Sequence, residues 1–343
     1  MPERSSKAVR RVLLAGFALL LVSVYIYLTK GEFELSVRDV VQTLLRIHPQ
    51  PDNDLIVFEF RLPRLVIAAL VGFGLAIAGA AVQGVTRNGL ADPGILGIHA
   101  GAGAAIVLYM YAFQGQVIRT GWTAIMMMPL FGLAGGAAAA ALLFAFAWQN
   151  GRLDAQRMIL TGIAISSGFG AFTLFLSLRM NAKDFEMAAV WLTGSIWNAN
   201  WIYILSMLPW FILLTPLLLR RTRTLDLFQL DESMVRSLGL GYGRELVILL
   251  LCSIGLVSAC VSVSGSISFV GLLAPHITRR LVGPRHRHLM PVCGLIGVLL
   301  VVISDLIAKS VFAPAELPVG IVISLVGVPY FLLLLYKSRS VGS

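Results

Sequence analysis

Few residues in this chain of 343 have the types and spacing that chemistry requires. Of its five histidines, only His286 and His288 lie close together, in the sequence RHRH. Two imidazoles at this spacing could contribute to a metal site, but the arginines beside them are more typical of a basic loop, which we favour. The P-loop pattern G-x-x-x-x-G-K-[ST] does not occur in the sequence. We therefore expect a protein that is not an enzyme, with no catalytic residue, metal site or cofactor of its own.

One carboxylate stands late in an apolar run, as Asp305, four residues before Lys309. Residues four apart share one face of a helix, so an ion pair between them would lower the cost of placing both in a membrane. A carrier driven by an ion gradient would need a series of such acids, and the sequence does not contain one. It therefore gives little support to an ion-coupled secondary carrier.

Composition identifies the class of protein. Hydrophobic residues make up 58% of the chain and charged residues only 13%, which is typical of a protein that crosses the membrane many times. The net charge of +10 could indicate nucleic-acid binding, but alternating the polar stretches between two sides puts 18 of the 27 Lys and Arg on one side and 9 on the other. This is the positive-inside pattern of a bacterial inner-membrane protein with both termini in the cytoplasm, so we expect no nucleic-acid partner.

A membrane crossing needs about 20 apolar residues, and the chain contains ten candidates. We predict an all-α integral membrane protein in which residues 1–343 form one transmembrane domain. The candidate spans are 11–29, 64–84, 94–113, 122–148, 158–178, 200–219, 246–264, 267–282, 291–308 and 318–336.

The stretch 246–278 is too long for a single crossing, because a helix of that length would reach about 50 Å through a hydrocarbon core of about 30 Å. We place a break in the sequence SVSGSIS, at 262–268. Irregular backbone at that depth must be buried in protein or face a water-filled cavity, so a cavity nearby is expected.

The longest charged stretch between apolar runs is 220–245, and it contains a short amphipathic helix that should be marginal alone in water. Gly239 is the expected helix stop. Pattern alone leaves two interpretations open: a surface helix lying on its own domain, or a docking helix for a soluble partner. One side of the helix is apolar, with Leu230, Met234, Val235 and Leu238, and elsewhere around it are Asp231, Glu232 and Arg236.

Four blocks of sequence, in the right order, resemble one family of transport proteins. These blocks begin with RLPRLVIAALVGFGLAIAGAAVQGVTRNGLADPGILGIHAGA and cover 61–102, 230–243, 264–291 and 304–335. The family comprises the FecCD-type permease subunits of binding-protein-dependent ABC importers for ferric siderophores, haem and vitamin B12. The chain is similar over nearly its whole length, although it has Asn88-Gly89-Leu90 where the family usually has Asn-Pro-Leu.

The resemblance implies a fold and a set of partners. It implies the type II importer permease fold, two permease subunits around a central path, two ATPase subunits that bind ATP and Mg²⁺, and an extracytoplasmic binding protein. It also favours the docking-helix interpretation, because the helix matches the coupling helix that fits a groove on the ATPase. Contact with the ATPase is thereby implied for Leu230, Asp231, Glu232, Met234, Val235, Arg236, Leu238 and Gly239, with Met234, Val235 and Leu238 buried there.

The resemblance also implies roles at the two mouths of the path. Arg61 and Arg64 match a basic pair that meets acidic residues of the binding protein, and Lys309 stands where the family often has a third arginine. Guanidinium groups suit carboxylates because each can donate paired hydrogen bonds. A short alignment with vitamin B12 permeases puts Ala155 and Gln156 at an inner gate.

The function expected from all of this is the permease subunit of an importer for a ferric siderophore, with vitamin B12 or haem as alternative cargo. We favour a siderophore over vitamin B12 or haem because members of this family commonly transport iron. The sequence leaves open which chelate is carried, and whether the second permease is an identical or a related chain.

Overall fold

A computed structural model describes residues 6–31, 33–47, 50–94, 96–113, 122–149, 152–153, 155–311 and 316–339. Helices dominate, and one pair of two-residue strands is antiparallel, with Trp148 opposite Leu153. The elements in chain order are α1 (Ser6–Thr29), α2 (Val37–Leu44), α3 (Pro51–Asp54), the π-helix η1 (Leu55–Arg61), α4 (Leu62–Thr86), α5 (Ile98–Ala112), α6 (Trp122–Ala147), β1 (Trp148–Gln149), β2 (Arg152–Leu153), α7 (Ala155–Ser177), α8 (Ala182–Leu192), α9 (Trp201–Leu219), α10 (Thr222–Leu227), α11 (Glu232–Ser237), α12 (Tyr242–Ser264), α13 (Val270–Val282), α14 (His286–Ser310) and α15 (Val319–Arg339).

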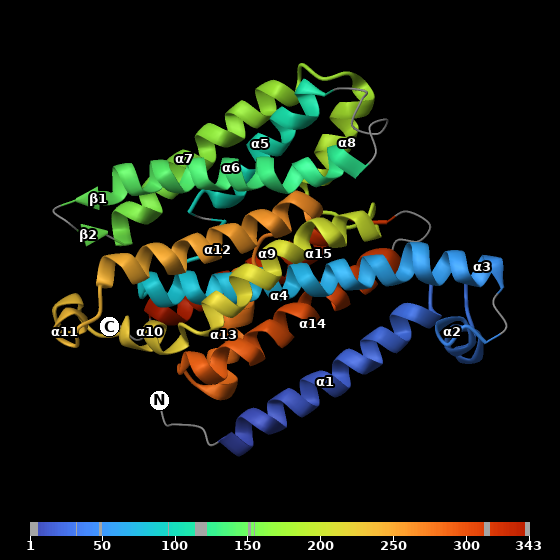
Figure 1. The fold of residues 1–343 in the computed structure, drawn as a ribbon, viewed down its shortest axis with the longest axis horizontal. Coiled ribbons are helices and arrows are strands. Elements are labelled where there is room, and N and C mark those ends of the chain that lie inside the picture. The colour runs from blue at the N-terminus through green and yellow to red at the C-terminus, as the bar shows by residue number, and fades with distance from the viewer. Residues whose placement is uncertain are drawn as a thin grey trace.

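The long helices run roughly along one direction and form a bundle (Figure 1). Within the described residues, seven helical segments are long and apolar enough to cross a membrane, and α5 and α15 contribute shorter apolar stretches. Together with the 13-residue α13, these helices correspond one to one with the ten predicted spans. The all-helical membrane class and the predicted span count are confirmed.

The bundle has two ends, which we name by their elements. The α11 end carries α10, α11, the β1–β2 hairpin and both marked termini, on the left of Figure 1. The α8 end carries α2, α3 and α8, on the right. Because α4, α12 and α14 lie in the middle of the bundle, they connect the two ends directly.

Glycine lets the central helices approach one another closely. A Cβ added at Gly72 of α4 would lie 2.3 Å from the carbonyl oxygen of Gly297 in α14, and one added at Gly297 would lie 2.2 Å from the carbonyl oxygen of Gly72. Gly101 of α5 and Gly135 of α6 form a second reciprocal pair. Small residues at such crossings let helix backbones pack in van der Waals contact, which is the main attraction available between helices in lipid.

The predicted break after 262 is also present. Helix α12 ends at Ser264, and α13 begins at Val270. Gly265 has a φ of +66°, and a Cβ there would lie 1.8 Å from the carbonyl oxygen of Trp191, so no other residue fits. Ser266, in this break, lines a cavity of about 350 Å³, as the buried irregular backbone led us to expect.

Candidate functional site

The charged stretch 220–245 forms two short helices, α10 and α11, at the α11 end. Helix α11 spans six residues and ends at Ser237, with Leu238 as its C-cap, and Gly239 follows with a φ of +81°, as predicted for a helix stop. A helix this short has little stability of its own, so contacts with the rest of the chain must hold it in place.

The apolar residues of this segment do not all face the same way. Val235 is completely buried within the chain, whereas Met234 is 55% exposed and Leu238 60% exposed. Leu230 is also exposed. The sequence interpretation put Val235 on the surface that meets the partner; the structure gives it an anchoring position, because its side chain points into this chain's own core. The surface left open for a partner is therefore Leu230, Met234 and Leu238.

Arg87 holds the segment from the other side. It follows the last residue of α4 with a φ of +52°, a left-handed conformation that turns the chain out of the helix. Its Nε donates a hydrogen bond to the carbonyl oxygen of Phe228 at 2.7 Å, and its Nη2 donates to the carbonyl oxygen of Leu230. Its Nη1 lies 3.4 Å from Asp231. One guanidinium thus ties the end of α4 to the turn between α10 and α11.

Other polar contacts fix α10 to α12 and α14. The carboxylate of Asp226 accepts hydrogen bonds from the backbone N–H of His286 at 2.8 Å and from its ring Nδ1 at 2.7 Å. Burial raises the pKa of Asp226, but the hydrogen bonds from His286 and the positive charge of Arg285 outweigh it and hold the pKa below its usual value. Arg221 pairs with Glu245 at 3.0 Å. The Nδ1 of His286, considered above as a metal ligand, is thus taken by this carboxylate, whereas its Nε2 has no hydrogen-bond partner among the described residues.

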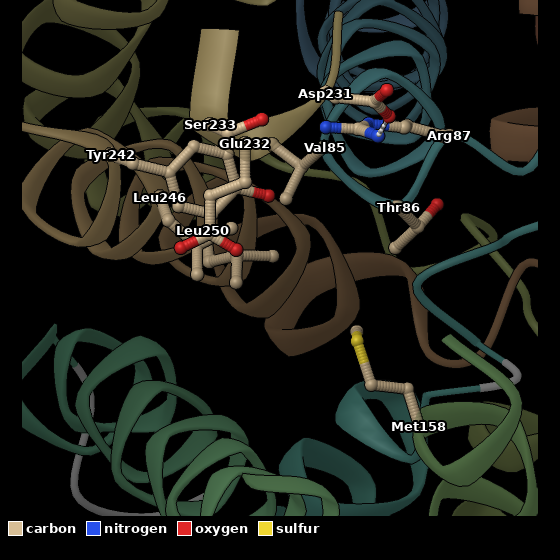
Figure 2. A pocket seen from close by; sticks show the side chains of 10 residues that line it. All are labelled: Val85, Thr86, Arg87, Met158, Asp231, Glu232, Ser233, Tyr242, Leu246 and Leu250. Carbon is tan, nitrogen blue, oxygen red and sulfur yellow. Dashed lines mark hydrogen bonds and ion pairs between the residues drawn. The ribbon is translucent and has the colours of Figure 1, made fainter. Parts of the chain in front are cut away.

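A cavity of about 380 Å³ opens beside α11 (Figure 2). Arg87 and Asp231 meet on one wall, Tyr242 and Leu246 lie on another, and Met158 of α7 stands across the opening. The cavity separates α7 from the group formed by α4, α11 and α12.

At the α8 end, Arg64 is bound within the chain. Its Nε and Nη2 donate to the two oxygens of Asp305, at 2.9 and 2.8 Å, in the paired geometry of an arginine and a carboxylate. Its Nη1 donates to Glu316 at 2.7 Å. Tyr27 donates to the same Asp305 at 2.5 Å. The ion pair predicted between Asp305 and Lys309 is wrong, because both oxygens of Asp305 are taken by Arg64.

Arg61 and Lys309, the other two residues expected to meet a binding protein, also have internal contacts. The guanidinium of Arg61 is buried and donates to the backbone carbonyls of Leu28 and Phe33, which closes the end of α1. The ammonium of Lys309 lies 3.5 Å from the centroid of the Tyr27 ring, in a cation–π arrangement. The structure thus brings the three basic residues to one end of the bundle but engages them with this chain.

Ala155 and Gln156, expected at an inner gate, are the first residues of α7. Their side chains lie outside the described residues, so the gate assignment stays a prediction.

Sequence reasoning missed two residues that make polar contacts at the two ends of the bundle. Arg87 and Tyr27 carry no motif that marks them, since their partners lie 141 and 278 residues away in the chain. The one available signal for Arg87 was its place directly after a long apolar run and before Asn88-Gly89, where a chain leaving a helix must turn.

Comparison with known proteins gives a consistent result. A family model described as the FecCD transport family matches residues 19–337. The iron-uptake system permease protein FeuC of Bacillus subtilis is 54% identical over 322 residues, which cover 94% of this chain and 96% of that protein. The iron(3+)-hydroxamate import system permease protein FhuG of the same organism is 42% identical, with coverage of 96% and 97%.

A solved structure of a metal-chelate type ABC transporter in an inward-facing conformation has the same fold. It superposes with a TM-score of 0.82 at 30% sequence identity, covering 96% of this chain and 99% of that one.

Proposed function

The chain belongs to the FecCD transport family, and from this membership we propose that it is the permease subunit of an ATP-driven importer for ferric siderophores. It forms the path through the membrane, and its helix α11 transmits the movement that opens this path. ATP and Mg²⁺ bind to separate ATPase subunits, and an extracytoplasmic protein delivers the cargo. A second permease subunit, identical or related, completes the path.

The observation that carries the coupling role is the arrangement of α11. The helix is anchored from below by Val235 and tied to α4 by Arg87, while Leu230, Met234 and Leu238 are exposed together. An anchored helix with an open apolar face is suited to insertion into a groove of a soluble partner. Because the anchor leads to α4, a movement of the partner would be transmitted into the central helices.

The orientation follows from charge. The α11 end carries most of the arginines and both termini, so it lies on the cytoplasmic side of a bacterial cell membrane. The ATPase subunits dock at that end, and the binding protein meets the α8 end.

The cargo is supported by the relatives named above, which are permeases for iron uptake and for iron(3+)-hydroxamate import. A third, from Escherichia coli strain K12, is the Fe(3+) dicitrate transport system permease protein FecD, at 38% identity over 284 residues. Each is a permease for iron by name, which favours a ferric chelate over vitamin B12 or haem.

At the α8 end we assign docking of the binding protein chiefly to Arg64. One of its nitrogens pairs with Glu316, whose side chain is 32% exposed, and a carboxylate of the incoming protein can replace Glu316 without disturbing Asp305. Lys309 stays a candidate. Arg61 is better explained by its two buried carbonyl contacts.

Uptake of iron-59 by cells lacking this chain tests the proposal. A panel of ferric siderophores is supplied, with haem and labelled vitamin B12 alongside, and the gene is then restored. Loss and recovery of one siderophore class is the expected result. If only vitamin B12 or haem uptake fails, the cargo is wrong and the importer function stands. Uptake that depends on the proton gradient and persists without ATP would contradict an ATP-driven importer.

A further inference from the structure

His99 is almost completely buried and yet has no hydrogen-bond partner among the described residues. Its side chain is 6% exposed in the first turn of α5, and neither Nδ1 nor Nε2 makes a hydrogen bond there. An imidazole must offer at least one N–H donor, and a buried polar group that is left unpaired loses its hydration without compensation. Such a loss at a single residue calls for a partner from outside the chain.

The residue lies against an open space. A cavity of about 350 Å³ is lined by His99 and Gly103 of α5, Gly170, Thr173 and Ser177 of α7, and Ser266 of the break before α13. Residues of α8 complete the wall. The helix end at Ser177 and the helix α8 that follows it put the cavity toward the α8 end, where cargo would enter if the proposed function is correct (Figure 1).

The hydrogen-bonding groups in the wall define what can bind. Thr173 and Ser177 donate their hydroxyl hydrogens to backbone carbonyls one turn earlier in α7, at 2.7 and 2.8 Å, so their oxygens are left as acceptors. A neutral His99 adds one donor and one acceptor. No Asp, Glu, Lys or Arg lines the cavity among the described residues, and the remaining wall is mostly apolar. The wall therefore suits an uncharged group that both donates and accepts hydrogen bonds.

Size limits the ligand further. A water molecule occupies about 30 Å³ of liquid, so the cavity of about 350 Å³ has the volume of roughly a dozen water molecules. A complete ferric chelate, in which the ligand must surround the metal, is larger than this. We propose that the cavity binds an uncharged amide- or hydroxyl-bearing arm of the transported chelate, with His99 as its hydrogen-bond partner. This inference rests on the proposed function.

Two pairs of variants separate the pocket from its surroundings. His99→Leu removes both hydrogen-bonding nitrogens, whereas His99→Gln keeps one donor and one acceptor. Gly170→Val places an isopropyl group in the cavity, and Gly168→Val is its matched control. Both glycines lie in α7 with nothing within 4 Å of an added Cβ, but only Gly170 lines the cavity. Both valines therefore alter helix propensity equally.

The assay uses the complete importer in proteoliposomes, with ATPase subunits and binding protein loaded with the ferric siderophore found in the uptake panel. It measures iron transported per ATP hydrolysed. We expect His99→Leu to lower this ratio about tenfold, the value of one or two lost hydrogen bonds. Gly170→Val should lower it by a similar factor, because the valine side chain takes space in the cavity that the arm of the chelate would use. His99→Gln and Gly168→Val should stay within about threefold of the unaltered protein.

Three results would overturn the inference. If His99→Leu transports like the unaltered protein, water alone satisfies the imidazole. If Gly168→Val loses as much as Gly170→Val, the cavity is not the cause. If the unaltered importer moves no ferric siderophore at all, the proposed function fails and takes this inference with it. That last outcome is distinguishable, because it appears before any variant is made.

Discussion

Replacement of Arg87 by methionine tests whether this side chain couples α11 to the membrane helices. Methionine keeps an unbranched apolar stem of similar length but removes the donors to the carbonyls of Phe228 and Leu230 and the contact with Asp231. The turn between α10 and α11 would then be held mainly by Val235. We expect the segment to separate from α4 more often, while the long helices of the bundle stay packed.

The size of the effect follows from the hydrogen bonds that methionine cannot make. A hydrogen bond to a charged group contributes about 1.5–3 kcal/mol when buried. The side chain of Arg87 is 34% exposed, so hydrogen bonds to water offset part of this stabilisation when the contacts are lost. We therefore take about 2–3 kcal/mol for the two carbonyl hydrogen bonds together. At about 1.4 kcal/mol per tenfold change, the open population of the segment rises about 30- to 140-fold.

Hydrogen exchange reports this opening directly. Backbone amides from 228 to 239 should exchange about 30- to 140-fold faster in Arg87→Met, with no change in α4 or α12. Iron transported per ATP should fall in the same variant. For the exchange measurement the control is Arg236→Met, because among the described residues Arg236 pairs only with Glu232 one turn away, and such i,i+4 pairs contribute about 0.3–0.5 kcal/mol. Equal exchange in Arg87→Met and the unaltered protein would refute the assignment of Arg87 as the tie.

Three other substitutions have expected outcomes. Leu238→Asp puts a charge on the exposed face of α11 and should reduce ATPase binding at least tenfold in a pull-down without lowering the melting temperature; retained binding would remove this face from the interface. Gly72→Ala should destabilise the bundle by at least about 1–3 kcal/mol in a thermal scan, because its Cβ would lie 2.3 Å from a carbonyl oxygen of α14. Gly243→Ala is the control and should not destabilise the bundle, because its Cβ would have nothing within 4 Å. Glu316→Gln weakens the internal partner of Arg64, so the binding protein should associate faster in surface plasmon resonance, and a slower rate would argue against competition for Arg64.

The sequence alone determined the membrane-spanning helices of this protein. Lengths of apolar runs and the basic residues between them are local properties, and they predicted ten spans that the structure matches one to one. The break at 262–268 also followed from local arithmetic, since a stretch of that length cannot cross once. The stop at Gly239 followed from the conformational freedom of glycine.

Tertiary structure decided which apolar residues are buried and which are exposed. Periodicity put Val235 and Met234 on one apolar side of α11, but their different exposure depends on where that helix rests. A helix of six residues has no preferred orientation until it packs, so pattern could not separate the anchoring residue from the exposed one.

The polar contacts were beyond sequence reasoning for the same reason. Arg64 binds Asp305, which is 241 residues away, and the sequence offered the nearer Lys309 as the partner. Local spacing predicts pairs along one helix, whereas a buried charge pairs with whichever opposite charge the packed helices bring closest. The unpaired imidazole of His99 belongs to this class, because only the assembled bundle reveals that no group of the described residues makes a hydrogen bond with it.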